Sequence, residues 1–180
     1  MSNKIKIEPE SWLEKEFIFY YPVGALPAIL ERLRGTPKRL EWMVTQLPDR
    51  ILRQRIGEDW SIQEHIGHLY DLEELHEGRL DDFDAGLETL RAADMTNAKT
   101  YEADHNSSDL GELLAKFRET RMRFVERFEE MTAEEATRSA MHPRLKKPMR
   151  VIDLAHFTAE HDDHHLASIT YVARSLMSMK

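Results

Sequence analysis

The sequence has no cysteine in 180 residues. This absence excludes disulfide bonds, iron–sulfur clusters, thiolate zinc sites and a cysteine nucleophile. Any metal site would therefore consist of histidine and carboxylate ligands, and any thiol in the reaction would come from outside the chain. Histidine is abundant by contrast. The chain has nine histidines, and three of them lie within five residues of sequence: His161, His164 and His165.

The chain is also short of positive charge. It has 25 basic and 33 acidic residues, which gives a formal net charge of −8. Nucleic acids and anionic membranes carry charge of the same sign, so we expect neither as a partner.

No apolar run is long enough for a membrane span. The most apolar stretch, residues 17–30, is short and contains Pro22, Gly24 and Pro27. The residues before it are rich in glutamate, whereas a secretory signal carries uncompensated positive charge. We therefore expect a cytoplasmic protein.

Apolar residues recur at helical spacing in four segments, which predicts an all-α four-helix bundle over residues 26–180. The first segment contains Pro37, so we expect a short helical turn followed by a helix over about residues 37–47. A single kinked helix is the alternative.

The other three helices have clearer limits. A capping box of Ser61 and Glu64 predicts the start of the second helix, and its apolar spacing continues to about Leu90. The third helix is expected over residues 110–128 and the last over 151–176. A capping box from Thr132 to Glu135 predicts a short helix between them, and no segment shows a convincing strand pattern.

The first 25 residues contain a cluster of aromatic residues without helical spacing. We expect residues 1–25 to form an ordered arm that packs across the bundle or across a second subunit, because so many exposed aromatic rings are rare on a monomer. This reasoning predicts a homodimer. The aromatic residues of the arm are Trp12, Phe17, Phe19, Tyr20 and Tyr21.

Two histidines lie at the centre of the apolar face of the last helix. At about 100° per residue, His165 falls within about 40° of His161. A spacing of four residues places the two rings one turn apart, as in helices that offer two nitrogens to one metal. They could instead be two hydrogen-bonded core histidines. The same face contains Leu154, Phe157, Ser168 and Val172.

A metal site would need at least one more ligand, which the second helix can supply. Periodicity alone does not choose among its candidates. His65 would occupy the fourth position of the helix that follows Trp60, so it could simply pack on that ring. The candidates are Glu64, His65, His68, Asp71 and His76.

Three segments together resemble the DinB/YfiT-like superfamily of metalloenzymes: residues 60–69, residues 117–121 and residues 160–169. The resemblance implies a four-helix bundle in which three histidines hold a metal. Matched residue by residue, these are His68, His161 and His165. His65 and His164 flank these positions, so either could take the place of a ligand. The superfamily includes bacillithiol transferases and mycothiol-dependent enzymes.

Three neutral ligands leave the full charge of a divalent metal and an open coordination position, which is the catalytic pattern. Such a site would activate water or a low-molecular-weight thiol cosubstrate, so we expect a hydrolase or a thiol S-transferase with a small-molecule substrate. Zinc is favoured, with nickel, manganese or iron as alternatives. Glu64, Asp71 or Asp162 could serve as a base or support a ligand. The other hypothesis is a non-catalytic metal-binding bundle or a dimeric interaction module.

Two basic features have alternative interpretations. Arg121 lies on an apolar stripe, so it either forms a structural ion pair with Asp71, Glu74 or Glu160, or binds an anionic substrate. Residues 138–150 contain five basic residues and no acid. This segment is either a solvated connection or a surface that attracts anions.

Overall fold

A computed structural model describes residues 8–178 of the chain. Residues 1–7 of the expected arm and residues 179–180 lie outside the described range. The long helices are α1 (Leu26–Thr45), α3 (Ile62–Asp71), α4 (Glu73–Asp84), α6 (Leu110–Glu129) and α7 (Val151–Ser178). The short elements are η1 (Val23–Ala25), α2 (Asp49–Leu52), α5 (Ala98–Glu102), η2 (His105–Ser107), η3 (Glu135–Thr137), β1 (Ser139–His142) and β2 (Lys147–Arg150).

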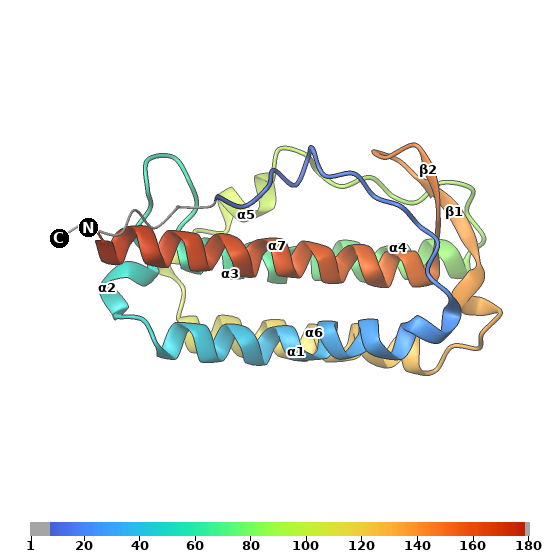
Figure 1. Cartoon of the computed structure of the whole chain (residues 1–180), viewed down its shortest axis with the longest axis horizontal. Coiled ribbons are helices and arrows are strands. Elements are labelled where there is room, and N and C mark those ends of the chain that lie inside the picture. Colours follow the sequence, from blue (N-terminus) through green and yellow to red (C-terminus); the bar gives the residue numbers. More distant parts are fainter. Residues whose placement is uncertain (1–7, 179–180) are drawn as a thin grey trace, which may run out of the picture.

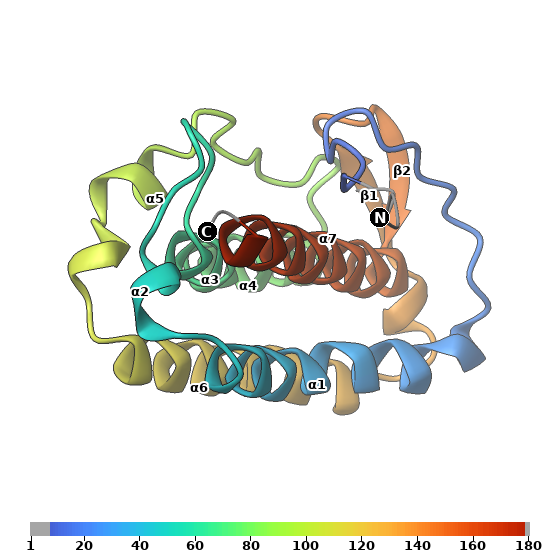
Figure 2. The same cartoon turned by 60° about the vertical axis from the view of Figure 1, so that its left-hand side comes forward.

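The long helices form two layers, with α1 and α6 in one and α3, α4 and α7 in the other (Figure 1). Helix α1 packs against α6 and α7, and α3 packs against the same two helices. The predicted four-helix bundle is therefore confirmed, with α3 and α4 together forming its second helix. The outer side of the α3–α7 layer faces the N-terminal segment, the loop after α4 and the two strands (Figure 2).

Helix α1 runs through Pro37 without interruption, so the expected break was wrong and the single helix is correct. A proline inside a helix costs about 3 kcal/mol. Leu33 and Leu40, on either side of Pro37, are both fully buried, and this packing against α6 and α7 outweighs the cost.

The second helix ends earlier than predicted, at Asp84 instead of Leu90. Gly86 has a positive φ of 67°, and the amide of Leu87 donates to the carbonyl of Asp82 at 3.0 Å, which is a Schellman motif. Leu90 is buried, but its amide donates to the carbonyl of Met141 in β1. Helical spacing predicted the wrong end for this helix because Leu90, the last apolar residue of the pattern, packs as part of an extended segment.

The two strands correct a further expectation, because residues 138–150 are not an irregular loop. β1 and β2 pair antiparallel, with Ser139 opposite Arg150 and His142 opposite Lys147. Each strand has four residues, which is too short for alternation to stand out, and Pro148 further masks the pattern. We call β1, β2 and their connection the hairpin.

The limits of α6 and α7 agree with the predicted third and fourth helices. The capping box at Thr132 and Glu135 is also present, followed by the short helix η3. No helix in residues 8–178 is long and apolar enough to cross a membrane.

The N-terminal arm, here residues 8–22, lies across its own bundle along α7 (Figure 1). Phe17 is buried, and the Trp12 ring lies 5.0 Å from Phe157 of α7. Ile18 and Tyr20 remain 73% and 87% exposed. Part of the aromatic cluster therefore packs within one chain, and the homodimer stays a prediction.

Candidate metal centre

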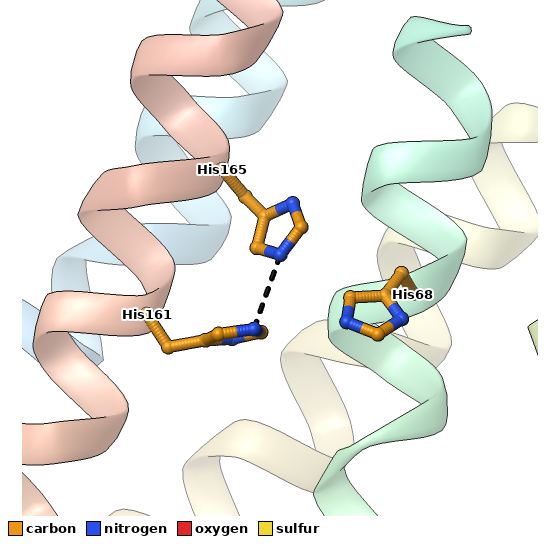
Figure 3. Close-up of side chains that lie close together, drawn as sticks. All are labelled: His68, His161 and His165. Atoms are coloured by element: carbon orange, nitrogen blue, oxygen red, sulfur yellow. Dashed lines mark hydrogen bonds between the residues drawn. The ribbon is translucent and has the colours of Figure 1, made fainter. Parts of the chain in front are cut away.

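Three histidine rings from two helices face one space between α7 and α3 (Figure 3). His161 and His165 come from α7 and His68 from α3, and one ring nitrogen of each lies within 4.8 Å of the other two. Nε2 of His161 and Nε2 of His165 are 3.1 Å apart. In a tetrahedral site with zinc–nitrogen bonds of about 2.0–2.1 Å, two ligand nitrogens lie about 3.3 Å apart. The two nitrogens of α7 therefore have the spacing of ligands to one divalent cation, and a nitrogen of His68 lies within 4.8 Å of both.

The outer nitrogen of His68 is held by a chain of polar side chains. The Thr100 hydroxyl donates to Oδ2 of Asp71 at 2.9 Å, so it can only accept at its 3.1 Å contact with Nδ1 of His68. This contact places the proton of His68 on Nδ1 and leaves Nε2 as a free lone pair. Nε2 of His105 also contacts Oδ2 of Asp71, at 2.8 Å. Supports of this kind orient metal ligands in proteins.

This chain depends on a glycine in α3. A Cβ on Gly67 would lie 2.2 Å from the ring of His105, which is an impossible contact. Only a residue without a side chain allows His105 to lie against the helix and reach Asp71. Sequence reasoning missed Thr100 and His105, because they lie in the short helices α5 and η2, within a polar segment that has no apolar periodicity.

His65 contacts His165 and does not itself belong to the cluster of three nitrogens. Nδ1 of His65 lies 2.9 Å from Nδ1 of His165, which leaves Nε2 of His165 for the central space. The ring of His65 also packs on Trp60 at 5.6 Å, as the sequence predicted. His164 is half-buried, and its ring contacts Trp12 and His165.

Burial keeps these histidines uncharged. It lowers the pKa of His65 and His68 to about 4, with smaller contributions from neighbouring histidines. Burial also holds the pKa values of His161 and His165 well below the usual range. Neutral imidazole is the form that binds a metal, so the ligands need no deprotonation at neutral pH.

The acids beside the histidines on α7 are all directed elsewhere. Glu160 pairs with Lys15 and Arg32, and Asp163 pairs with Arg32 and Arg39. In the described part of the chain, the cluster of three nitrogens includes no carboxylate. Any metal there would keep its full positive charge.

Arg121 forms a buried ion pair, but not with the predicted acids. It is fully buried and donates to Glu73 at 2.6 Å from Nη2 and to Asp162 through Nη1 and Nη2. The Thr36 hydroxyl donates to the same Asp162 at 2.7 Å. The three expected partners, Asp71, Glu74 and Glu160, lie in other interactions. Arg121 thus ties α6 to α4 and α7 beneath the histidines and is closed to a substrate.

Glu64 also has a structural position. Its carboxylate accepts from the backbone amide of Ser61 at 2.8 Å, which completes the predicted capping box, and it pairs with Arg55. Both interactions fix the start of α3 one turn before His68.

The histidines open into a cavity of about 610 Å³. Trp12 of the arm and Trp60 before α3 line it near the histidines, and residues of α4, of the loop after α4 and of the hairpin line most of the remainder. His76 lines it as well, buried and with no partner for Nδ1 within the described residues. The arm thus contributes a wall of the cavity, whereas the sequence predicted only that it packs across the bundle or a second subunit.

The sequence model of the DinB superfamily matches residues 32–169. The chain belongs to the DinB superfamily. The match includes α3 and most of α7, which hold the three histidines, and so confirms the resemblance inferred from their motifs. No curated protein matches this DinB chain in sequence.

Solved structures share the fold, and two of them illustrate the similarity to this chain. One is YfiT from Bacillus subtilis, described as a probable metal-dependent hydrolase with an unusual four-helix bundle topology, at 21% identity and a TM-score of 0.75. The match covers 91% of this chain and 94% of YfiT. The other is a Streptococcus pneumoniae protein at 16% identity and a TM-score of 0.62, with the same coverage of 91% and 94%.

Proposed function

We propose that this protein is a metal-dependent enzyme in which His68, His161 and His165 hold one divalent cation, zinc by preference. The observation that carries the proposal is the convergence of three uncharged ring nitrogens at the end of a large cavity. When bound, the cation would supply the positive charge that activates water, or an external thiol, as a nucleophile.

Hydrolysis is the first candidate reaction. YfiT, which shares the fold, is described as a probable metal-dependent hydrolase. Ser168, the serine on the same face of α7 as the histidines, is not activated as a nucleophile, because it donates its hydroxyl to the carbonyl of His164. We therefore expect no covalent protein intermediate, and mass spectrometry during turnover should find no substrate adduct on the chain.

Transfer to a low-molecular-weight thiol is the second candidate. A second cavity, of about 490 Å³, reaches His165 and His164 from the side of the arm and also contacts Trp12 and Trp60. Two reactants can therefore approach the histidines from different sides, as a transfer between a thiol and an electrophile requires.

Metal analysis tests the proposal directly. The purified protein should bind about one divalent cation per chain after removal and return of metal, and His161→Ala, His165→Ala and His68→Ala should each lose it. His156→Ala is the matched control, because His156 lies on α7 and stacks on Tyr21 outside the cluster. Full metal content in the three variants would refute the site.

Activity then separates the two reactions. The metal-loaded protein should be assayed with ester, amide and phosphoester substrates, with and without added thiols. Turnover without a thiol indicates hydrolysis, and turnover that needs one indicates transfer. Unchanged activity after chelation would refute metal dependence for either reaction. A bundle that holds metal but turns over none of these substrates would instead favour the non-catalytic role.

We also propose that the protein acts in the cytoplasm as a homodimer. The exposed side chains of Ile18 and Tyr20 on the arm support an association surface. Sedimentation at micromolar concentration should show a dimer that is weakened by Ile18→Ser with Tyr20→Ser. A monomer with the arm intact would contradict this proposal.

A further inference from the structure

The end of the 610 Å³ cavity away from the histidines is lined by hydrogen-bond donors that have few protein acceptors. Arg79 comes from α4, and His142 and Arg144 come from the hairpin. Lys146 lines the same end from the turn of the hairpin. This concentration of positive charge is unusual in a chain with a net charge of −8.

Arg79 is buried without an ion pair among the described residues. Its side chain is 2% exposed, and its hydrogen bond from Nε goes to the backbone carbonyl of Arg91 at 3.2 Å. The acid three residues along α4, Asp82, is bound by Arg91 at 2.7 Å. Burial lowers the pKa of Arg79 to about 10; the nearby carboxylate of Asp82 opposes this shift, and the charges of Arg144 and Arg91 add to it. Arg79 therefore remains a cation at neutral pH, with no carboxylate in direct contact among the described residues.

The hairpin adds two more unsatisfied donors. Nη2 of Arg144 is buried without a partner among residues 8–178. Nδ1 of His142 accepts a hydrogen bond from the amide of Leu145 at 3.2 Å, so the ring proton lies on Nε2. Nε2 of His142 is also buried and has no partner in the part of the chain that the structure describes. Buried donors are rarely left without an acceptor, so these two groups indicate a missing one.

The carboxylate that lines this cavity does not neutralise them. Asp94 accepts hydrogen bonds from the amide and hydroxyl of Thr96 and from the amide of Ala98, at 2.7–2.9 Å. Its oxygens are thus engaged in closing its own loop. The cationic end of the cavity keeps its charge and its free donors.

We propose that Arg79, His142 and Arg144 form an anion-binding subsite, so that the substrate is a small molecule with a carboxylate or phosphate group. Guanidinium groups suit both anions because their parallel N–H donors match pairs of oxygens. Resting on the proposed function, this arrangement holds the anionic group at the hairpin end and directs the reacting bond toward the three histidines. The anion attraction considered for residues 138–150 thus belongs to the inner face of the hairpin.

Binding to metal-free protein tests the subsite separately from catalysis. Isothermal titration calorimetry at low salt should compare benzoate and phenylphosphonate with benzamide, which has the shape of benzoate but no charge. We expect benzamide to bind at least about tenfold more weakly than the better anion. The preference between the two anions distinguishes a carboxylate substrate from a phosphate substrate. Removal of metal ensures that the anion cannot bind to a cation held by the histidines.

Arg144→Gln and Arg79→Met should each weaken binding of the better anion by about tenfold or more. The control is Arg138→Gln, which removes the same charge from the start of the same basic segment, where Arg138 pairs with Asp84 and Glu135. It should bind within about twofold of the parent. Circular dichroism should show that each variant folds. If Arg79→Met does not fold, the binding measured with Arg144→Gln alone tests the subsite.

Three outcomes would overturn the subsite: benzamide binding as tightly as the anions, no anion binding at millimolar concentration, or unchanged binding in Arg144→Gln. Failure of the proposed function gives a different result, namely normal anion binding by a protein that binds no metal at its histidines.

Discussion

Replacement of Arg121 should be among the most damaging single changes in the bundle. Arg121→Met keeps a long apolar side chain but leaves Glu73 and Asp162, which are 2% and 0% exposed, as buried carboxylates without their cation. Breaking a buried ion pair by removing one partner costs about 3–5 kcal/mol. Because the free energy of unfolding of a domain is only roughly 5–15 kcal/mol, this variant should be only marginally stable.

Urea unfolding at about pH 8 measures this loss, since burial raises the pKa of Glu73 to about 7 and the carboxylate is ionised at that pH. The matched control is Arg118→Met on the same helix, whose partner Glu41 lies at the surface. It should cost about 1 kcal/mol or less.

The loss in Arg121→Met should also shrink as the pH falls from about 8 to 6. Without the guanidinium, which lowers the pKa of Glu73, the folded-state pKa of Glu73 rises further above its unfolded value, so protonation favours the folded state. A triple variant with Glu73→Gln and Asp162→Asn should recover part of the stability. Equal losses for Arg121→Met and Arg118→Met would refute the structural role of this network.

Three further predictions follow from the supports and the cavity. Between about pH 7.5 and 5.5 the metal-free protein should lose about 1 kcal/mol for His65 alone, because its folded pKa of about 4 lies below the unfolded value of 6.5 and the unfolded chain takes up the proton. Urea unfolding of His65→Phe at both pH values should show a correspondingly smaller difference, and an unchanged one would contradict the assignment. Thr100→Val should weaken metal affinity by about 10–100-fold in a competition with a chelating dye, because His68 loses its Nδ1 partner, whereas Thr120→Val on the exposed side of α6 should not. Lys146→Gly should raise the unfolding free energy by up to about 1 kcal/mol, since Lys146 has a φ of 53°, and thermal unfolding should show a higher midpoint.

Helical periodicity predicted the bundle because each long helix buries one continuous stripe. It predicted α6 and α7 closely for this reason, and the last turn of α4 poorly because Leu90 is buried by backbone pairing with β1. Gly86 was the available signal for the true end of the helix. The predicted break at Pro37 was wrong because the prediction considered the local cost of a proline inside a helix and not the packing of Leu33 and Leu40.

The three clustered histidines could be named from sequence because their motifs stand at helical spacing and resemble a known superfamily. Their supports could not, since Thr100 and His105 reach the site through the fold of a loop. The partners of Arg121 were mispredicted because Glu73 follows the change from α3 to α4 at Leu72, and this change decides which acids face inward. The basic segment 138–150 indicated that Arg144 could attract an anion, but nothing in the sequence joined it to Arg79 and His142, because the hairpin that brings them together was not predicted.

The position of the arm also determines the order in which the site is completed during synthesis. Residues 8–22 leave the ribosome well before α7, but their contacts are with that helix: Trp12 packs on His161, Lys15 pairs with Glu160, and Glu8 accepts a hydrogen bond from Tyr171. These contacts form only after both segments have emerged, so the arm takes its place after the helices made between it and α7 can already fold. Until then the cavity lacks the wall that Trp12 provides, and the histidines of α7 are open to solution on that side.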